Sequence, residues 1–470
     1  MEADCNRFVT RNSFTIKTAS GIMHPPNAPL ESQLEFCFPK EPVSRRISMT
    51  CRPASIFPSM IAAACLLIFA GPARSQEALR MSLAGSLAAE SQQQAESTIG
   101  YYNLLWGPVA WRFSSGLGFD YDDNINLQSQ NREGDFIVRP NLNTQTHWPI
   151  TKWNSLDVTL GAGYSFHAIY SRWNQFYVDP GSGLSFNIYA GDCVINLHDR
   201  ISITENAYQN PTAGGNGDYA QLENTAGAST LWDLNKLAAQ LGYDHANDIS
   251  IGSSQQVPDT TSENFFLTAG LHFLPQITAG VEGGVGLISY SQAQNTLNQP
   301  DATQWNAGVF CKAQISQYIS GQLDAGYTIY APSATGAFTN LNSAANLYFQ
   351  LSLTHRVNRF LNYTLSAGES TESSFYGQPY NYYFARLNPA WNLFRKYQLS
   401  TPLWWQKGSR LYALGGAGDY DQIGAGINIS RPITQKLAGS LGWQFVRESS
   451  SQSSLNYTAN IVSLNFTYQF

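Results

Sequence analysis

The feature that most constrains this chain is a two-residue alternation of apolar and polar side chains, which recurs from position 109 to the last residue. In the first stretch large apolar side chains occupy alternate positions, as Val109, Trp111, Phe113, Phe119 and Tyr121 show. The same alternation recurs over 142–148, 156–170, 265–273, 277–287, 305–315, 319–329, 347–353, 423–429 and 437–445. Because neighbouring residues of a strand point to opposite faces, each stretch predicts a β-strand with one apolar and one polar face.

Composition indicates what these faces meet. Charged residues make up only 13% of the chain and aromatic residues another 13%, yet the mean hydropathy is −0.24. No apolar run in the C-terminal four-fifths is long enough to cross a bilayer as a helix. A membrane protein with this sequence must therefore cross as strands, in a barrel that is apolar outside and wet inside.

The connections between the strands carry a second pattern. Short turns over 149–153, 190–192, 233–235, 275–276, 316–317, 356–359 and 431–435 alternate with longer segments over 124–134, 209–217, 248–263, 292–301, 331–344, 407–419 and 448–455. The longer segments are rich in Gly, Ser, Asn and Gln, so we expect them to tolerate solvent and to offer binding surface. The sequence predicts an all-β fold over 109–470, a closed antiparallel transmembrane β-barrel of 16 to 18 strands. We prefer 18, and poor alternation over 380–406 leaves the count open.

The N-terminal part indicates export. An apolar run over 60–71 is preceded by Arg45, Arg46 and Arg52 and followed by Ala73-Arg74-Ser75. This pattern predicts a signal peptide over 49–75 with cleavage before Gln76. Residues 1–48 are then an over-extended start or a disordered leader, and 76–108 form a polar periplasmic leader. Lipidation of Cys65 is the weaker alternative, because the apolar run continues beyond it.

Both ends of the predicted barrel carry a resemblance. The last strand alternates up to the terminal Phe470, and it resembles the closing strand of bacterial outer-membrane proteins, in which a terminal Phe is an assembly signal. This implies location in the outer membrane, with outer-membrane lipids and the barrel assembly machinery as partners. The segment 116–125, Gly-Leu-Gly-Phe-Asp-Tyr-Asp-Asp-Asn-Ile, resembles the opening of outer-membrane β-barrel porins, some of which are associated with exopolysaccharide export.

Ionisable side chains on the polar register are the candidate pore lining. They are Arg112, Arg139, Asp157, His167, Arg200, Glu282, Lys312 and Asp324. Charges of both signs along a lumen would tune the passage of small hydrophilic solutes or saccharide. The alternatives are salt bridges across a plugged interior, or a non-conducting surface barrel with an adhesive or structural role. Oligomeric state is left open, and the acidic balance argues against nucleic acid as a partner.

Other groups suggest chemistry more weakly. Asp120, Asp122, Asp123 and Asn124 could offer oxygen ligands to calcium, but they do not match a calcium loop and do not share one face of a strand, so a polar strand exit is favoured. His245 and His355 lie on apolar registers, where a lipid-processing enzyme could place a catalytic histidine. Neither has a nearby Ser in a convincing arrangement, so we expect no enzymatic activity and no cofactor or metal. Asp199 falls on an apolar register, and we expect a bulge or a strand end there.

Overall fold

A computed structural model describes residues 102–205, 208, 220–251, 258–291, 300–333, 344–373, 379–394, 396–411, 417–451 and 453–470. The predicted signal peptide, the extension before it and most of the predicted leader lie outside these residues. In the described part of the chain, no helix is long and apolar enough to span a membrane.

The described residues form strands and two short 3-10 helices. In chain order these are β1 (Leu104–Trp106), β2 (Val109–Asp122), β3 (Asp135–Thr151), β4 (Asn154–His167), η1 (Ser171–Trp173), β5 (Gln175–Val178), β6 (Gly183–Ala190), β7 (Cys193–Thr204), β8 (Gln221–Asp233), β9 (Leu237–Ser250), β10 (Thr260–Leu274), β11 (Ile277–Tyr290), β12 (Ala302–Ser316), β13 (Ile319–Pro332), β14 (Ala344–Arg356), β15 (Leu361–Ser373), β16 (Pro379–Leu393), β17 (Tyr397–Ser400), β18 (Leu403–Leu411), β19 (Ala417–Pro432), β20 (Leu437–Ser450), η5 (Ser453–Leu455) and β21 (Tyr457–Gln469).

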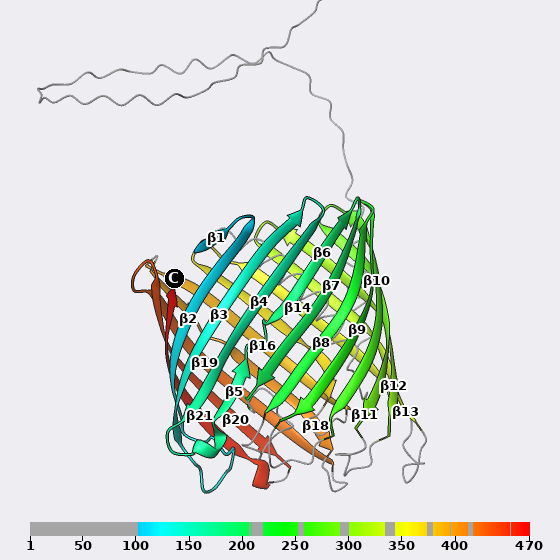
Figure 1. The fold of residues 1–470 in the computed structure, drawn as a ribbon. Coiled ribbons are helices and arrows are strands. Elements are labelled where there is room, and N and C mark those ends of the chain that lie inside the picture. The colour runs from blue at the N-terminus through cyan, green and yellow to red at the C-terminus, as the bar shows by residue number, and fades with distance from the viewer. Residues whose placement is uncertain are drawn as a thin grey trace, which may run out of the picture. The chain divides into compact units, whose positions relative to one another are not determined.

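These strands form one closed antiparallel sheet (Figure 1). The last strand, β21, pairs with β2 from Ser114↔Gln469 to Asp122↔Ile461, which joins the two edges of the sheet. The pairs β5/β6 and β17/β18 are each two halves of one wall strand, because both halves of each pair bond to the same neighbours. The three-residue β1 pairs only with the start of β2 and is not counted as a wall strand. The wall thus has 18 strands among the described residues, which confirms the predicted fold class and the preferred count.

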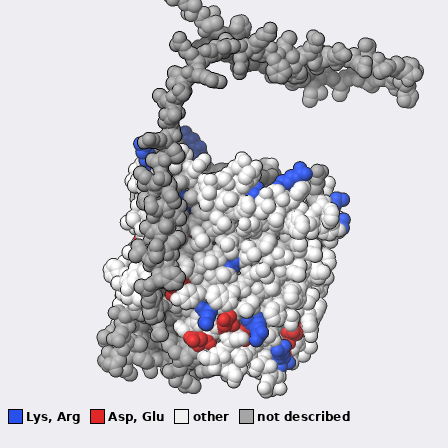
Figure 2. Space-filling model, turned by 180° about the vertical axis from the view of Figure 1, so that it is seen from behind, with Lys and Arg blue, Asp and Glu red and all other residues white. Residues whose placement is uncertain are grey.

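The alternation separates the two faces of the wall. On the outer face large apolar side chains are exposed, as Leu142 (66%), Val281 (56%) and Leu441 (54%) show. On the inner face polar and ionisable side chains are buried, among them Asp244, Gln304 and Asp324. Figure 2 shows that much of the wall on one side carries few charged groups, and that acidic side chains gather toward the end with the long connections.

The first described strand, β1, and the C-terminus both lie at the rim of the barrel that has the short turns (Figure 1). There β1 pairs with the start of β2, Leu104 opposite Trp111, so the end of the predicted leader extends the wall. The Asn103 side chain bonds to both backbone groups of Phe113, as a neighbouring strand would. It accepts from Phe113 N at 3.0 Å and donates to Phe113 O at 2.6 Å. Phe470 N donates to the same carbonyl at 3.3 Å, so the residue before β1 and the C-terminal residue both bond to Phe113.

Two expectations on irregular segments need revision. Asp199 lies in the middle of β7, exposed on the outer face, with no register shift in the pairing of β7 with β6 or β8, so the expected bulge or strand end is wrong. The weak alternation over 380–406 has a structural cause: β16 places Tyr380, Tyr382 and Phe384 on the inner face, where they pack against Tyr420. Apolar side chains on both faces hide the two-residue period.

Candidate functional site

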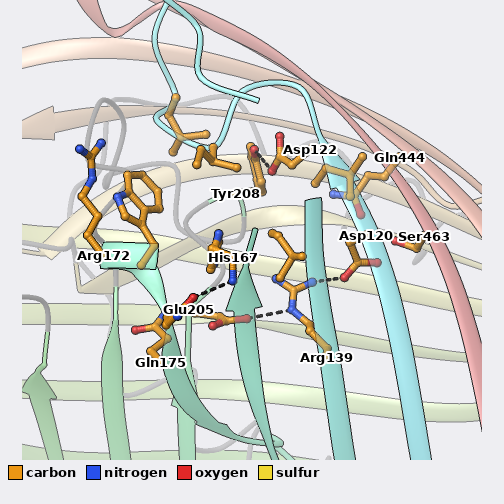
Figure 3. A pocket seen from close by; sticks show the side chains of 16 residues that line it. Asp120, Asp122, Arg139, His167, Arg172, Gln175, Glu205, Tyr208, Gln444 and Ser463 are labelled. Carbon is orange, nitrogen blue, oxygen red and sulfur yellow. Dashed lines mark hydrogen bonds and ion pairs between the residues drawn. The ribbon is translucent and has the colours of Figure 1, made fainter. Parts of the chain in front are cut away.

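A cavity of about 200 Å³ lies inside the barrel at the end with the long connections. The strands β2, β3, β4, β5, β20 and β21 contribute to its lining, together with three connecting segments (Figure 3). Its lining residues are Asp120, Asp122, Ile125, Leu127, Ile137, Arg139, His167, Arg172, Trp173, Asn174, Gln175, Glu205, Tyr208, Gln444, Ile461 and Ser463. Two of the eight predicted lining residues, Arg139 and His167, belong to this cavity.

Arg139 is the centre of a charge network in the cavity. It stands on the inner face of β3, where its Nη1 contacts Asp120 on β2 and its Nε donates to Glu205 Oε1 at 3.0 Å. Nε also lies 3.1 Å from Ser165 Oγ on β4. The second carboxylate oxygen of Glu205, Oε2, is buried without a hydrogen-bond partner among the described residues. Sequence reasoning missed Glu205, because it lies 66 residues from Arg139 and beyond the end of a strand.

The first part of the segment between β2 and β3, residues 124–127, folds into the cavity, whereas 128–132 are exposed. The expectation of a solvated loop over 124–134 is therefore wrong for its first part and right for its middle. Asn124 is fully buried, and its side chain bonds to the backbone of Gln128 and Thr458. Ile125 and Leu127 are buried as well, and Leu127 adopts a positive φ of 51°. Buried backbone groups need partners, and the asparagine amides supply them, which is why a polar sequence can fold inward here.

A buried carboxylate holds the next segment, which joins β4 to β5. Asp135 is fully buried, and its Oδ1 accepts from the backbone N–H of Ile169 at 3.0 Å. Its Oδ2 accepts from Tyr170 N at 3.2 Å and lies 3.1 Å from His167 Nδ1. The His167 ring faces Trp173 of η1, with 6.3 Å between ring centroids. His167 therefore helps to shape the cavity wall rather than standing alone in a lumen.

Tyr208 lies between β7 and β8 in the chain and bonds to the end of β2. Its hydroxyl donates to Asp122 Oδ2 and lies 3.0 Å from Asn124 O. Its ring packs against Tyr457 of β21 at a centroid distance of 6.2 Å. Burial raises the pKa of Tyr208 well above its ordinary value of 10.0, so the phenol stays protonated and remains a donor.

The remaining predicted lining residues all lie on the inner register, in other parts of the wall. Asp157 Oδ1 lies 2.6 Å from His147 Nδ1, and Arg200 is within electrostatic range of Asp244. Gln322 donates to both carboxylate oxygens of Asp324. Arg112 and Lys312 form no ion pair with a described residue. That solutes pass between these side chains stays a prediction.

Glycines let long side chains lie flat on one part of the inner wall. Tyr348 of β14 crosses Gly326 of β13 and Gly308 of β12, and its hydroxyl donates to Glu282 of β11 at 2.7 Å. A Cβ at Gly308 would lie 2.1 Å from the tyrosine oxygen, and one at Gly326 would lie 2.3 Å from the ring. Because glycine has no side chain at these two positions, Tyr348 can lie along the inner wall.

The oxygen groups considered for calcium are occupied by protein donors. Asp120 bonds to Arg139, Asp122 accepts from Asn124 N at 2.8 Å, and Asp123 accepts from Asn460 N at 2.7 Å. Asp120 and Asp122 are buried on the inner face, whereas Asp123 bonds to the last strand. No group of three candidate ligands in the described ranges could hold a metal ion.

The two histidines considered for lipid chemistry lie on the outer face. His245 Nδ1 is 2.9 Å from Glu263 Oε1, and its Nε2 is 3.0 Å from the Asn247 amide. A histidine that activates a nucleophile needs a hydroxyl or thiol at the second nitrogen, and here an amide occupies that position. His355 Nδ1 contacts the Tyr363 hydroxyl at 3.1 Å.

Comparisons with known proteins leave the family open. No family model and no curated protein matches this chain. Among solved structures it is similar to Pseudomonas aeruginosa OpdQ, at 10% identity and a TM-score of 0.44, over 77% of this chain and 99% of that one. It is also similar to Acinetobacter baumannii OccAB3 (12%, 0.42, over 77% and 99%) and to Pseudomonas aeruginosa OccK7 (10%, 0.45, over 78% and 99%). Because these TM-scores are low, the likeness carries no information about what this chain does.

Proposed function

We propose that this chain is a porin-like channel of the bacterial outer membrane, through which small hydrophilic solutes or saccharide pass passively. The observation that carries the proposal is the distribution of polar groups in an 18-strand barrel. Ionisable and amide side chains occupy the inner register, whereas Leu142, Val281 and Leu441 stand exposed on the outer one. Barrels of about 16 to 18 strands have room for an aqueous channel, while side chains fill a barrel of about eight.

Planar-bilayer recording on the refolded barrel tests this function. We expect discrete conductance steps, with values that change when Lys312 or Asp324 is replaced. Absence of conductance at any voltage, from protein shown to be folded by its heat-modifiable gel migration, would contradict the channel. Adding saccharide during recording separates the two solute classes, because a bound saccharide interrupts the current whereas a passing salt ion does not.

The proposal includes the route by which the chain reaches the membrane. A signal peptide over 49–75 would direct export, and Phe470 would act as the assembly signal. In support of a recognition role, Phe470 is 52% exposed, and the ring it packs against among the described residues is that of its neighbour Tyr468. Deleting Phe470 should lower the yield of membrane-inserted protein in cells while leaving secretion intact. Unchanged yield of the truncated chain would refute the assembly role.

A non-conducting surface barrel is the second candidate, and one observation favours it. The segment between β2 and β3 buries Ile125 and Leu127 inside the barrel end, where an open channel would need space. Deleting residues 125–131 distinguishes the two candidates. A channel should conduct before the deletion and conduct more after it, whereas a barrel with a structural or adhesive role should show no current before it.

A further inference from the structure

Hydrogen-bonded polar side chains cross four adjacent strands on the outer face of the barrel. This outward polar strip consists of Asp199 on β7, Asn224 on β8, His245 and Asn247 on β9, and Thr261 and Glu263 on β10. The Asn224 amide donates to Asp199 at 2.7 Å, and Asn224 stands opposite Asn247 in the β8–β9 register. Thr261 donates to Asn247 at 3.0 Å, and Glu263 bonds to His245 and to the Tyr243 hydroxyl.

The position of the strip along the strands is unusual, because apolar side chains lie on both sides of it. Toward the short turns follow Leu197, Leu241 and Leu267, all more than 40% exposed. Toward the long connections follow Ile203, Leu222, Ile249 and Ile251, of which Ile203, Leu222 and Ile249 are register neighbours. Ile249 and Ile251 are 39% and 49% exposed.

This arrangement does not fit a wall covered by lipid alone. A strand tilted by about 40° rises roughly 2.6 Å per residue along the barrel axis, so His245 stands roughly 21 Å above Leu237, within an apolar band about 25 Å tall. If the strip lies in the band, Asp199 and Glu263 face hydrocarbon, which is costly for charged groups. If it lies above the band, the aliphatic side chains beyond it face water. A protein surface covers both kinds of side chain.

We propose that this face binds a second copy of the chain. The strip is suited to meet itself, because its two amides keep complementary groups free. Both N–H groups of the Asn224 amide are engaged within the chain, but its Oδ1 accepts from no described residue. The Asn247 amide has one N–H left after its bond to His245, so Asn247 of one copy can donate to Asn224 of the other. Asp199 has one donor among the described residues, the Asn224 amide, and a carboxylate can accept more. A two-fold axis near β8 sets equivalent strips against each other, as in an isologous interface. Ala226 stands directly opposite Asp199 on β8, so the surface there is shallow and permits close approach.

The inference rests on the membrane-embedded barrel of the proposed function, and oligomeric state is measured separately from conductance and insertion. Native mass spectrometry on the full barrel from lipid nanodiscs should show a dimer or higher closed oligomer. A variant with Asp199→Leu, Asn224→Leu and Asn247→Leu should be monomeric. It lacks the hydrogen-bonding groups that join the two copies, and its leucine side chains can face lipid without cost. Its folding is checked by heat-modifiable migration. The matched control, Lys407→Leu, Asp421→Leu and Arg447→Leu, changes the outer face of β18 to β20 and should keep the oligomer.

Cross-linking tests the same face in an otherwise unaltered barrel. Cys193 and Cys311, the two cysteines beyond position 75, are replaced by serine. A cysteine at Ala226 should then give dimers with a short bis-maleimide, and a cysteine at Ala325 on β13 should give few. A monomeric parent barrel in nanodiscs, an unchanged oligomer in the strip variant, or equal cross-linking at both positions would overturn the proposal.

Discussion

Two parts of the inner wall use ionisable residues in different ways. On β2 to β4, Arg139 is tied to Asp120 and Glu205, and the adjoining segments fold inward over the network. On β11 to β14, Glu282 accepts a hydrogen bond from Tyr348, and Lys312 has no ion-pair partner among the described residues. Both sets stand on the same inner register. A charged residue on that register is therefore tied into an ion-pair network in one region and has no ion-pair partner among the described residues in the other.

The largest expected effect is at the network. Arg139→Leu should lower the free energy of unfolding by about 3 kcal/mol, because Asp120 and Glu205 would be buried without a counter-charge. Urea unfolding in lipid vesicles, followed by gel mobility, measures the loss. Lys312→Leu is the control and should change stability little, since that side chain has no ion-pair partner to lose. Equal losses in the two variants would remove the distinction between the regions.

A moderate effect is expected where Tyr348 lies on the wall. Gly308→Ala places a Cβ 2.1 Å from the tyrosine oxygen, so the ring must move and its bond to Glu282 breaks. We expect a loss of about 1–3 kcal/mol and a lower conductance, because the displaced ring enters the lumen. Gly442→Ala is the control on the same face, with its nearest atoms 3.7 Å away. A conductance that falls equally in both variants would contradict this reading.

Tyr208 should show a smaller effect that depends on pH. Tyr208→Phe removes the bonds to Asp122 and Asn124 and should cost about 1 kcal/mol. Because the folded pKa of Tyr208 is raised, its contribution is complete below the unfolded value of 10.0 and is lost as pH rises toward the folded pKa. The protection of backbone amides between β2 and β3, measured by hydrogen exchange relative to the unprotected rate at the same pH, should therefore fall above about pH 10 in the parent protein. The Tyr208→Phe variant should lack this step, and a step of equal size in it would assign the pH dependence to another group.

The smallest effect on stability, and a specific one on transport, is expected at Lys312. Lys312→Gln should leave the unfolding midpoint unchanged and shift the reversal potential toward cation selectivity, because one lumen cation without an ion-pair partner is removed. Lys152→Gln is the matched control, since Lys152 lies over the Trp153 ring at a short turn. If the control shifts the reversal potential as much, selectivity is set outside the lumen.

Local patterns in the sequence were sufficient for the wall. Alternation assigned Arg112, Arg139 and Lys312 to the inner register, because a strand places successive side chains on opposite faces whatever its neighbours are. The same argument was weak over 380–406, where β16 carries aromatic residues on both faces and β17 and β18 are separated near Pro402. The connection between β16 and β17 was missed for the same reason.

The sequence by itself determined the fold class, the two faces of the wall and the closing strand that ends at Phe470. Only the tertiary structure decided that Glu205 reaches Arg139, that Asn124 and Leu127 fold inward, and that Asp199 joins a strip across four strands. The physical reason is that alternation is a property of one strand, whereas these contacts depend on closure. Closing the sheet brings β2 beside β21 and sets connecting segments across the barrel end, so the partner of each charge is chosen by the packing of distant segments.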